Sequence, residues 1–401
     1  MGLSDTDAQS RWIAFRTISW ACRALRAVAS GCIVAALGAH LCCPKTFAQI
    51  SDPTRTDRSE KSWSSTATRD ILAARIPVQV TESHSQNGDQ SWDQRSVRTP
   101  GIDRDLLPYQ EMEIVTSQVD AGIARTTTRL FGRDGNGARS IIQLTEEEKH
   151  ELPDGTSTLV STTFNPDVNG RLLLVKQEIV EAKTIGDGIQ ETKMTVMLPN
   201  VDGALAPALK SDEVLTRRTD GTAESKKLIF VTDGTGNWPL NEVHTITTRQ
   251  EGANRTREER VSRRDSEGKL SDVSDVVTKE SDSNGGEKRI TVDTYSIDVP
   301  GTPQDGKLHR IERATTFAKN DAVGQTIQQT VERLNPGDPG VGLRPSILVD
   351  GKTIRASSED LSTVTIRARD VNGSYGIVYV DTTKWERSTA TRVEEMPSKR
   401  K

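Results

Sequence analysis

The sequence predicts an all-β protein: a long antiparallel β-meander of about fourteen strands, in hairpin repeats of about 33 residues, forming a curled or single-layer sheet. Three observations predict this fold. Glycines recur at turn-like positions with an alternating spacing, most of them follow Asp or Asn, and the segments between them are rich in Thr, Val and Ile. Asp-Gly and Asn-Gly supply the positive φ angles of tight hairpin turns, and β-branched residues suit a pleated surface.

The glycine spacing defines the repeat. From Gly122 to Gly236 the successive intervals are 15, 18, 15, 18, 15, 18 and 15 residues, and they then loosen toward Gly340. The structural turns are therefore assigned to seven glycines: Gly137, Gly155, Gly170, Gly188, Gly203, Gly221 and Gly236. Fifteen and eighteen differ by an odd number, and side chains alternate faces with a period of two. A bulge or a longer turn at alternate ends must therefore absorb the difference.

A helical solenoid is the alternative, because ankyrin repeats also have a period of about 33 residues. Ankyrin units need two helices and a Thr-Pro-Leu-His signature, and neither is visible here. Face patterning is weak: Leu172, Leu173 and Leu174 are consecutive, and residues 253–289 contain almost nothing to bury. We therefore expect a thin sheet, held by backbone ladders and by cross-strand charge pairs.

The first 48 residues have the form of a signal peptide. A basic lead ends at Arg26, an apolar run spans residues 27–43, and small residues precede a cleavage site near Ala48. An N-terminal membrane anchor is the alternative, whereas lipoprotein processing at Cys32 would leave too short an apolar region. Residues 49–104 are predicted to be a disordered polar linker, 105–340 the β-meander repeat domain, 341–385 a C-terminal β cap and 386–401 a charged tail.

Charge and cysteine content exclude several classes of function. All four cysteines lie in the leader, so the mature chain has neither a disulfide nor a thiol nucleophile. Removing the leader changes the net charge from -4 to about -7, which argues against a general nucleic-acid binder. Charged residues on both strand faces and few aromatics argue against a transmembrane barrel, which needs lipid-facing apolar positions and aromatic girdles.

The segment Asp167-Val168-Asn169-Gly170 has the oxygen ligands and the glycine of a calcium loop. The twelfth position of such a loop should be a bidentate Glu, but Lys176 occupies it. At the equivalent position other Asp/Gly clusters have Gln143, Ser274 and Tyr379. The sequence therefore predicts a turn there and no metal site.

Other chemistry is also missing from the sequence. The mature histidines His84, His150, His244 and His309 have no second ligand at zinc spacing. Nucleophile-elbow, P-loop and His-Glu-x-x-His motifs are absent. We therefore predict no cofactor and no enzymatic activity.

Three turns share an Asp/Gly pattern followed by Arg or Lys and Leu: residues 167–172, 265–270 and 304–308. The pattern resembles the YD repeat of RHS-type secreted proteins, in which Asp and Gly shape the turns of a long β strip. The tyrosine of that repeat is replaced by Pro166, by Arg264 and by Pro303 or Gln304. The resemblance implies a strip that serves as a shell or an adhesive stalk.

The sequence thus predicts an exported, non-enzymatic β-repeat protein, periplasmic or extracellular, which presents a binding surface or acts as a structural spacer. A glycan or another surface protein would be its partner, and nucleic acid would not. The alternative function is a glycan-acting enzyme that uses carboxylates on the curled sheet.

Overall fold

The structure is a computed structural model. It describes residues 62–71, 76–100, 106–133, 137–186, 188–282, 286–297, 306–335, 337, 339–356, 359–370 and 372–387. The predicted signal peptide, the alternative membrane anchor and the charged tail beyond residue 387 lie outside the described residues. In the described part of the chain, no helix is long and apolar enough to cross a membrane.

The described chain forms twenty strands and one short 3-10 helix. The strands are β1 (Ser62–Ile71), β2 (Ile76–Asn87), β3 (Gln90–Pro100), β4 (Leu106–Asp120), β5 (Ile123–Arg133), β6 (Arg139–Glu151), β7 (Thr156–Pro166), β8 (Leu172–Gly186), β9 (Ile189–Pro199), β10 (Leu205–Arg217), β11 (Ala223–Val231), β12 (Leu240–Glu251), β13 (Asn254–Arg264), β14 (Leu270–Asp282), β15 (Glu287–Ser296), β16 (His309–Asn320), β17 (Gly324–Leu334), β18 (Leu343–Arg355), β19 (Glu359–Arg369) and β20 (Tyr375–Arg387); η1 is Pro339–Val341.

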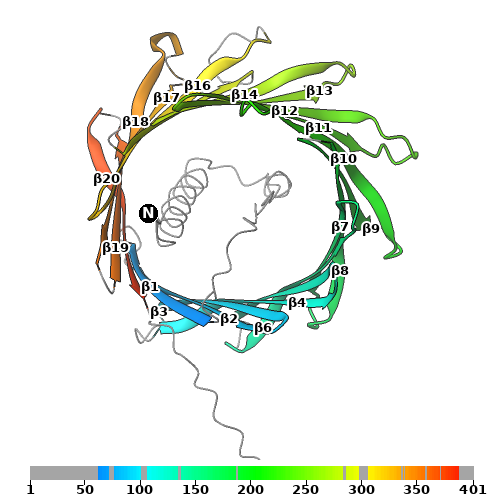
Figure 1. Cartoon of the computed structure of the whole chain (residues 1–401). Helices are drawn as coiled ribbons and strands as arrows, with labels where there is room; N and C mark the ends of the chain where they lie inside the picture. Colours follow the sequence, from blue (N-terminus) through cyan, green and yellow to red (C-terminus); the bar gives the residue numbers. More distant parts are fainter. Residues whose placement is uncertain are drawn as a thin grey trace, which may run out of the picture. The chain divides into compact units, whose positions relative to one another are not determined.

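The strands close into a barrel. Each strand pairs antiparallel with its neighbours in sequence, and β1 also pairs with β20, from Ser65↔Arg387 to Ile71↔Asp381. Figure 1 looks along the barrel and shows the wall as a ring. The all-β antiparallel meander in a curled, single-layer sheet was predicted correctly, but the closure of that sheet into a barrel was not predicted. Closure gives hydrogen-bond partners to the backbone groups that an edge strand would leave unpaired. The pattern of side chains in the sequence does not show whether this backbone pairing takes place.

The strand count and the segment boundaries also differ from prediction. Residues 62–71 and 76–100, assigned to a disordered linker, form β1, β2 and β3. Residues 341–385, assigned to a separate cap, continue the meander through β18, β19 and β20. Twenty strands therefore replace about fourteen. The linker prediction is wrong there because it weighed apolar content, whereas these strands are ordered by backbone pairing on both sides.

Bulges recur on alternate strands. The pairing skips one residue on every even-numbered strand from β4 to β20: Tyr109, Ile142, Val175, Ala208, Asn241, Val273, Ile311, Ser346 and Val378. From Tyr109 to Asn241 these positions follow the 33-residue repeat. They are the adjustment that the odd difference between the glycine intervals predicts.

The registers also determine the tilt and the width. Following cross-strand partners once around the wall returns to β1 with a stagger of about 22 residues. For twenty strands this stagger corresponds to a tilt of about 40° and a backbone radius of roughly 18 Å.

The two rims of the barrel are different. We call the rim where β1 begins and β20 ends the proximal rim, and the opposite one the distal rim. Strands are joined by two to five residues at the proximal rim and by four to twelve at the distal rim. The described chain therefore enters and leaves the barrel at the rim with the shorter turns.

Candidate functional site: the two faces of the wall

The registers assign each wall residue to one of two faces, because directly opposed residues point the same way. Asp293, Arg313 and Glu332 follow one another on one face, and Thr294, Glu312 and Arg333 on the other. The buried apolar residues of the wall lie on the second face, except for Phe131: Val80, Val196, Ile229, Val331, Ile347, Val349, Val364 and Ile366. Side chains crowd on the concave side of a curved sheet, so we assign this face to the interior.

The inner face is rich in charge. Arg263 donates a hydrogen bond to Glu242 at 2.7 Å, and His244 lies 3.1 Å from the same carboxylate. Elsewhere on this face Arg333 donates to Glu312 at 2.8 Å, and Arg257 lies 2.9 Å from Glu259. Most of the inner wall is therefore suited to contact with water and ions.

One sector of the inner face is apolar instead. Val331, Ile347, Val349, Val364 and Ile366 belong to β17, β18 and β19, and Ile366 is only 2% exposed. Near them on the inner face of β19 and β20 are the buried polar residues Asp360, Asp381 and Thr383. This sector holds five of the nine buried apolar residues of the described wall.

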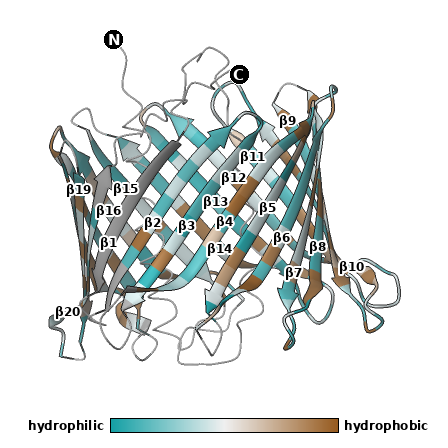
Figure 2. Ribbon diagram, turned by 90° about the horizontal axis from the view of Figure 1, so that it is seen from below, coloured by the Kyte–Doolittle hydropathy of each residue, from teal (hydrophilic) through white to brown (hydrophobic). Residues whose placement is uncertain are grey.

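The outer face carries ion pairs toward the proximal rim. Arg125 donates to Glu148 at 2.7 Å, Lys319 to Glu287 at 2.9 Å, and Lys384 lies 2.6 Å from Glu359. On β8 and β9, Glu181 is directly opposed to Lys193, and Lys183 to Glu191. Figure 2 accordingly shows hydrophilic and hydrophobic segments interspersed along the wall.

The outer face of β7, β8 and β9 becomes apolar toward the distal rim. Phe164 is opposed to Leu174, and Pro166 to Leu172. On the next pair Met197 is opposed to Pro207, and Pro199 to Leu205. Further along the same face, the ammonium of Lys210 on β10 lies 4.2 Å from the centre of the Trp238 ring, in the loop between β11 and β12.

A charged cluster occupies the outer face of β13 to β17. Arg313 donates to both carboxylate oxygens of Asp293, at 2.7 and 2.9 Å, and Asp293 is only 6% exposed. Arg260 lies 3.6 Å from the buried Asp275 and also contacts Glu258. The cluster lies in the wall itself, unlike the more exposed pairs near the proximal rim.

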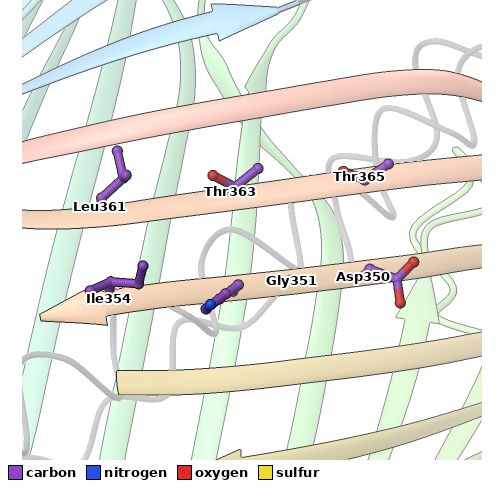
Figure 3. A pocket seen from close by; sticks show the side chains of 7 residues that line it. Asp350, Gly351, Ile354, Leu361, Thr363 and Thr365 are labelled. Atoms are coloured by element: carbon purple, nitrogen blue, oxygen red, sulfur yellow. The ribbon is translucent and has the colours of Figure 1, made fainter. Parts of the chain in front are cut away.

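A shallow outer depression lies between β18 and β19 (Figure 3). Its lining combines Ile354 and Leu361 with Thr363, Thr365 and Asp350. Asp350 is hydrogen-bonded to Arg367. The depression therefore holds no unpaired carboxylate of the kind that acid–base chemistry requires.

The distal turns repeat one hydrogen-bonding pattern. In the turn of Asp167 to Arg171, the Asp167 carboxylate accepts hydrogen bonds from the amides of Asn169 and Arg171, and Gly170 N donates to Asp167 O. The turns that begin at Asn200, Asp265 and Asp370 have the same bonds. The side chain thus caps its own turn. In the turn of Asp233, hydrogen bonds from Thr235 and Asn237 lower the pKa of that carboxyl to about 2.

The seven glycines singled out by the sequence all lie in turns at positive φ. Their φ values range from 77° at Gly170 to 97° at Gly236. They are distributed over both rims and do not converge on one site. Their surroundings differ: a Cβ on Gly188 would lie 2.1 Å from Arg217 O, whereas nothing lies within 4 Å of that position on Gly170.

Histidines do not gather in the described part of the chain, where no group of three His, Cys, Asp or Glu residues is placed to hold a metal ion. His84 is bonded to Asp93, His150 to Glu148 and His244 to Glu242. Sequence reasoning did not single out Val168 and Val201, which are fully exposed at distal turn tips. The signal was present as Asp-Val-Asn-Gly and Asn-Val-Asp-Gly, 33 residues apart.

No protein-family model matches the chain, and a search of curated proteins found no match. Solved structures do resemble it. A mutant porin of Rh. blastica has a TM-score of 0.41 at 6% identity, covering 82% of this chain and 98% of its own. Pseudomonas aeruginosa OccK2, solved with glucuronate, has 0.43 at 8%, with the same coverage. The siderophore receptor PirA of Pseudomonas aeruginosa has 0.42 at 10%, covering 82% of this chain and 81% of its own.

These findings correct three predictions. The first is the predicted function, an exported surface-presenting protein or spacer with a glycan-acting enzyme as the alternative. That prediction assumed an open strip, whereas β1 and β20 pair to close the sheet. The exclusion of a transmembrane barrel is contradicted in its premise, because the described strands close into a barrel. The description as a soluble secreted or periplasmic repeat protein is corrected on the same grounds. The barrel was excluded wrongly because the charged residues on the two faces were considered over the whole chain, and not separately for each sector of the wall.

Proposed function

We propose that the protein is a channel-forming β-barrel of the cell envelope, which lets polar solutes or ions pass through its interior. The observation that carries this proposal is the closed twenty-stranded wall with a charged inner face. A barrel with an even number of antiparallel strands, shorter turns at the rim that bears both chain ends and longer ones opposite has the general plan of outer-membrane barrels. The leader predicted from the sequence would direct export. Passage needs no covalent chemistry, so the proposal remains non-enzymatic.

The width supports the same function. A backbone radius of roughly 18 Å exceeds that of small barrels, whose interior is filled by their own side chains. Ions passing inside would meet the charges of the inner face and would not sense those of the outer face.

The test is single-channel conductance of the full chain, purified from membranes and added to planar lipid bilayers. We expect stepwise conductance with a selectivity set by inner charges. Lys226 and Lys227 provide a matched pair, since they are adjacent on β11 and point to opposite faces. Lys227→Glu adds negative charge to the inner face, so its reversal potential in a salt gradient should shift toward cation selectivity. Lys226→Glu, on the outer face, should leave the reversal potential unchanged.

Two outcomes would oppose the proposal. Absence of conductance from folded protein would remove the channel. An equal shift for both lysine variants would show that current does not follow the inner face.

A further inference from the structure

We infer that one sector of the distal rim is the barrel's lipid-contacting surface: Phe164, Val168, Leu172, Leu174, Met197 and Val201, here called the distal patch. The inference deepens the proposed channel function and rests on it. It states which rim and which strands contact hydrocarbon.

The first observation is at the turn tips. Val168 and Val201 occupy the second position of neighbouring distal turns and are 100% and 101% exposed. Leu172 follows the first turn on the outer face and is 39% exposed. Water-exposed apolar tips on adjacent hairpins form a patch of the kind that marks an interaction surface.

The second observation is that these turns satisfy their own backbone. In the first turn Asp167 N donates to Arg171 O, Gly170 N donates to Asp167 O, and the Asp167 carboxylate accepts two more amides. The turn at Asn200 repeats all four bonds. A polar backbone group enters a lipid environment cheaply only when it is already bonded within the protein. These turns therefore meet a requirement of contact with lipid that contact with a protein partner would not impose.

The third observation is the depth of uncharged surface below the tips. On the outer face of β8 the first charge below Leu172 is Glu181, and on β9 the first charge below Pro199 is Lys193. At a strand tilt of about 40°, these spans correspond to roughly 20 Å along the barrel axis on β8 and roughly 15 Å on β9. An outer-membrane barrel presents an apolar band about 25 Å tall. The opposed pair Glu181 and Lys193 marks the lower limit of the contact.

The surface is limited to one sector. At similar depth on β13 to β16 the outer face carries Arg260, Asp275, Asp293 and Arg313. A charged side chain that faces lipid near the middle of the bilayer is destabilising. This sector therefore faces water or protein, and hydrocarbon contacts the distal patch.

The turn at Asp265 provides a matched control. Ser266 holds the position that Val168 holds in its turn, at the same rim, with the same hydrogen bonds, in the charged sector. Ala253, an exposed residue of a proximal hairpin, controls for the opposite rim. Because all cysteines lie in residues 22–43, replacing those four with Ser gives a cysteine-free full chain.

In that background Val168→Cys, Val201→Cys, Ser266→Cys and Ala253→Cys each receive an environment-sensitive fluorophore. The labelled proteins are mixed with phosphatidylcholine–phosphatidylglycerol vesicles, with and without brominated acyl chains. We expect a blue shift and at least twofold quenching by brominated lipid for labels at 168 and 201, and neither effect at 266 and 253. Equal quenching at 266 would refute the sector, and no quenching at 168 and 201 would refute lipid contact. Conductance of the same samples separates the two proposals: a channel without quenching removes only this inference, and quenching without conductance removes only the channel.

Discussion

Gly188 and Gly170 allow the roles of backbone conformation and close packing to be separated. Both lie in turns at nearly the same φ, 80° and 77°. A side chain at such a φ costs roughly 1–2 kcal/mol, so Gly→Ala should destabilise both turns by that amount. At Gly188 the added Cβ would also meet Arg217 O at 2.1 Å, and Arg217 N donates to Gly188 O at 2.6 Å. Disturbing this contact costs about 1 kcal/mol more for the hydrogen bond, and the displaced backbone adds to it.

The assay is amide hydrogen exchange of the full chain, which reports local opening without requiring two-state unfolding. We expect Gly188→Ala to lower the opening free energy at residues 186–190 and at Arg217 together, by about 2–4 kcal/mol. Gly170→Ala should lower it by about 1–2 kcal/mol at its own turn and leave Arg217 unchanged. Unaltered protection of Arg217 in Gly188→Ala would refute the close approach of the two hairpins.

Three further predictions concern a turn, the outer cluster and the repeat. The folded pKa of Asp233, about 2, lies below the ordinary value of 3.8. Asp233 should therefore stabilise its turn fully above pH 4, and this stabilisation should be lost as the pH falls through 2. A titration of the Asp233 carboxyl with a midpoint near 3.8 would contradict the hydrogen bonds from Thr235 and Asn237. Arg313→Met leaves the buried Asp293 with the more distant Arg310, at 3.4 Å, and should lower stability by roughly 2–3 kcal/mol. Lys319→Met, which breaks an exposed pair, should change stability little. Denaturant midpoints compare the two variants, and equal midpoints would argue against burial of the cluster. Deleting residues 172–204 removes the hairpin of β8 and β9 and joins Arg171 to β10, which then takes the place of β8. The product should be an eighteen-stranded barrel of about 16 Å radius. A conductance no smaller than that of the full chain would count against a wall built by repetition.

Local structure could be read from the sequence, because turns and strands depend on short-range chemistry. Asp or Asn before Gly at Gly155, Gly170 and Gly203 gives a turn wherever the chain passes, since positive φ is a property of that residue pair. The odd interval difference likewise required bulges on alternate strands. Closure could not be read in this way. It depends on whether β1 meets β20, hundreds of residues away, and the β1 segment is too polar to suggest a strand that closes a sheet.

The candidate surfaces were hidden for a different reason. A strand with one polar face reveals its orientation by alternation, but here both faces are polar over most of the wall. On β11, Lys226 faces outward and Lys227 inward, and no pattern of hydropathy separates them. The distal patch is visible only when β7, β8 and β9 lie side by side, because each strand contributes only one or two apolar residues to it.

The sequence period and the barrel tilt are two expressions of one quantity. Going straight across one hairpin, partner to partner, leads from Thr158 through Glu181 to Lys193, a step of 35 residues. The same step leads from Lys193 through Asp212 to Leu228. The repeat is about 33 residues, so each hairpin lies about two residues further along the wall than the one before it. Ten hairpins therefore accumulate a stagger of about twenty residues, close to the value of about 22 obtained by following the registers around the wall. A meander whose repeat equalled its crossing step would have no stagger and could not close with tilted strands. The spacing of glycines in this chain thus encodes the tilt of the barrel, and with the number of repeats it sets the width.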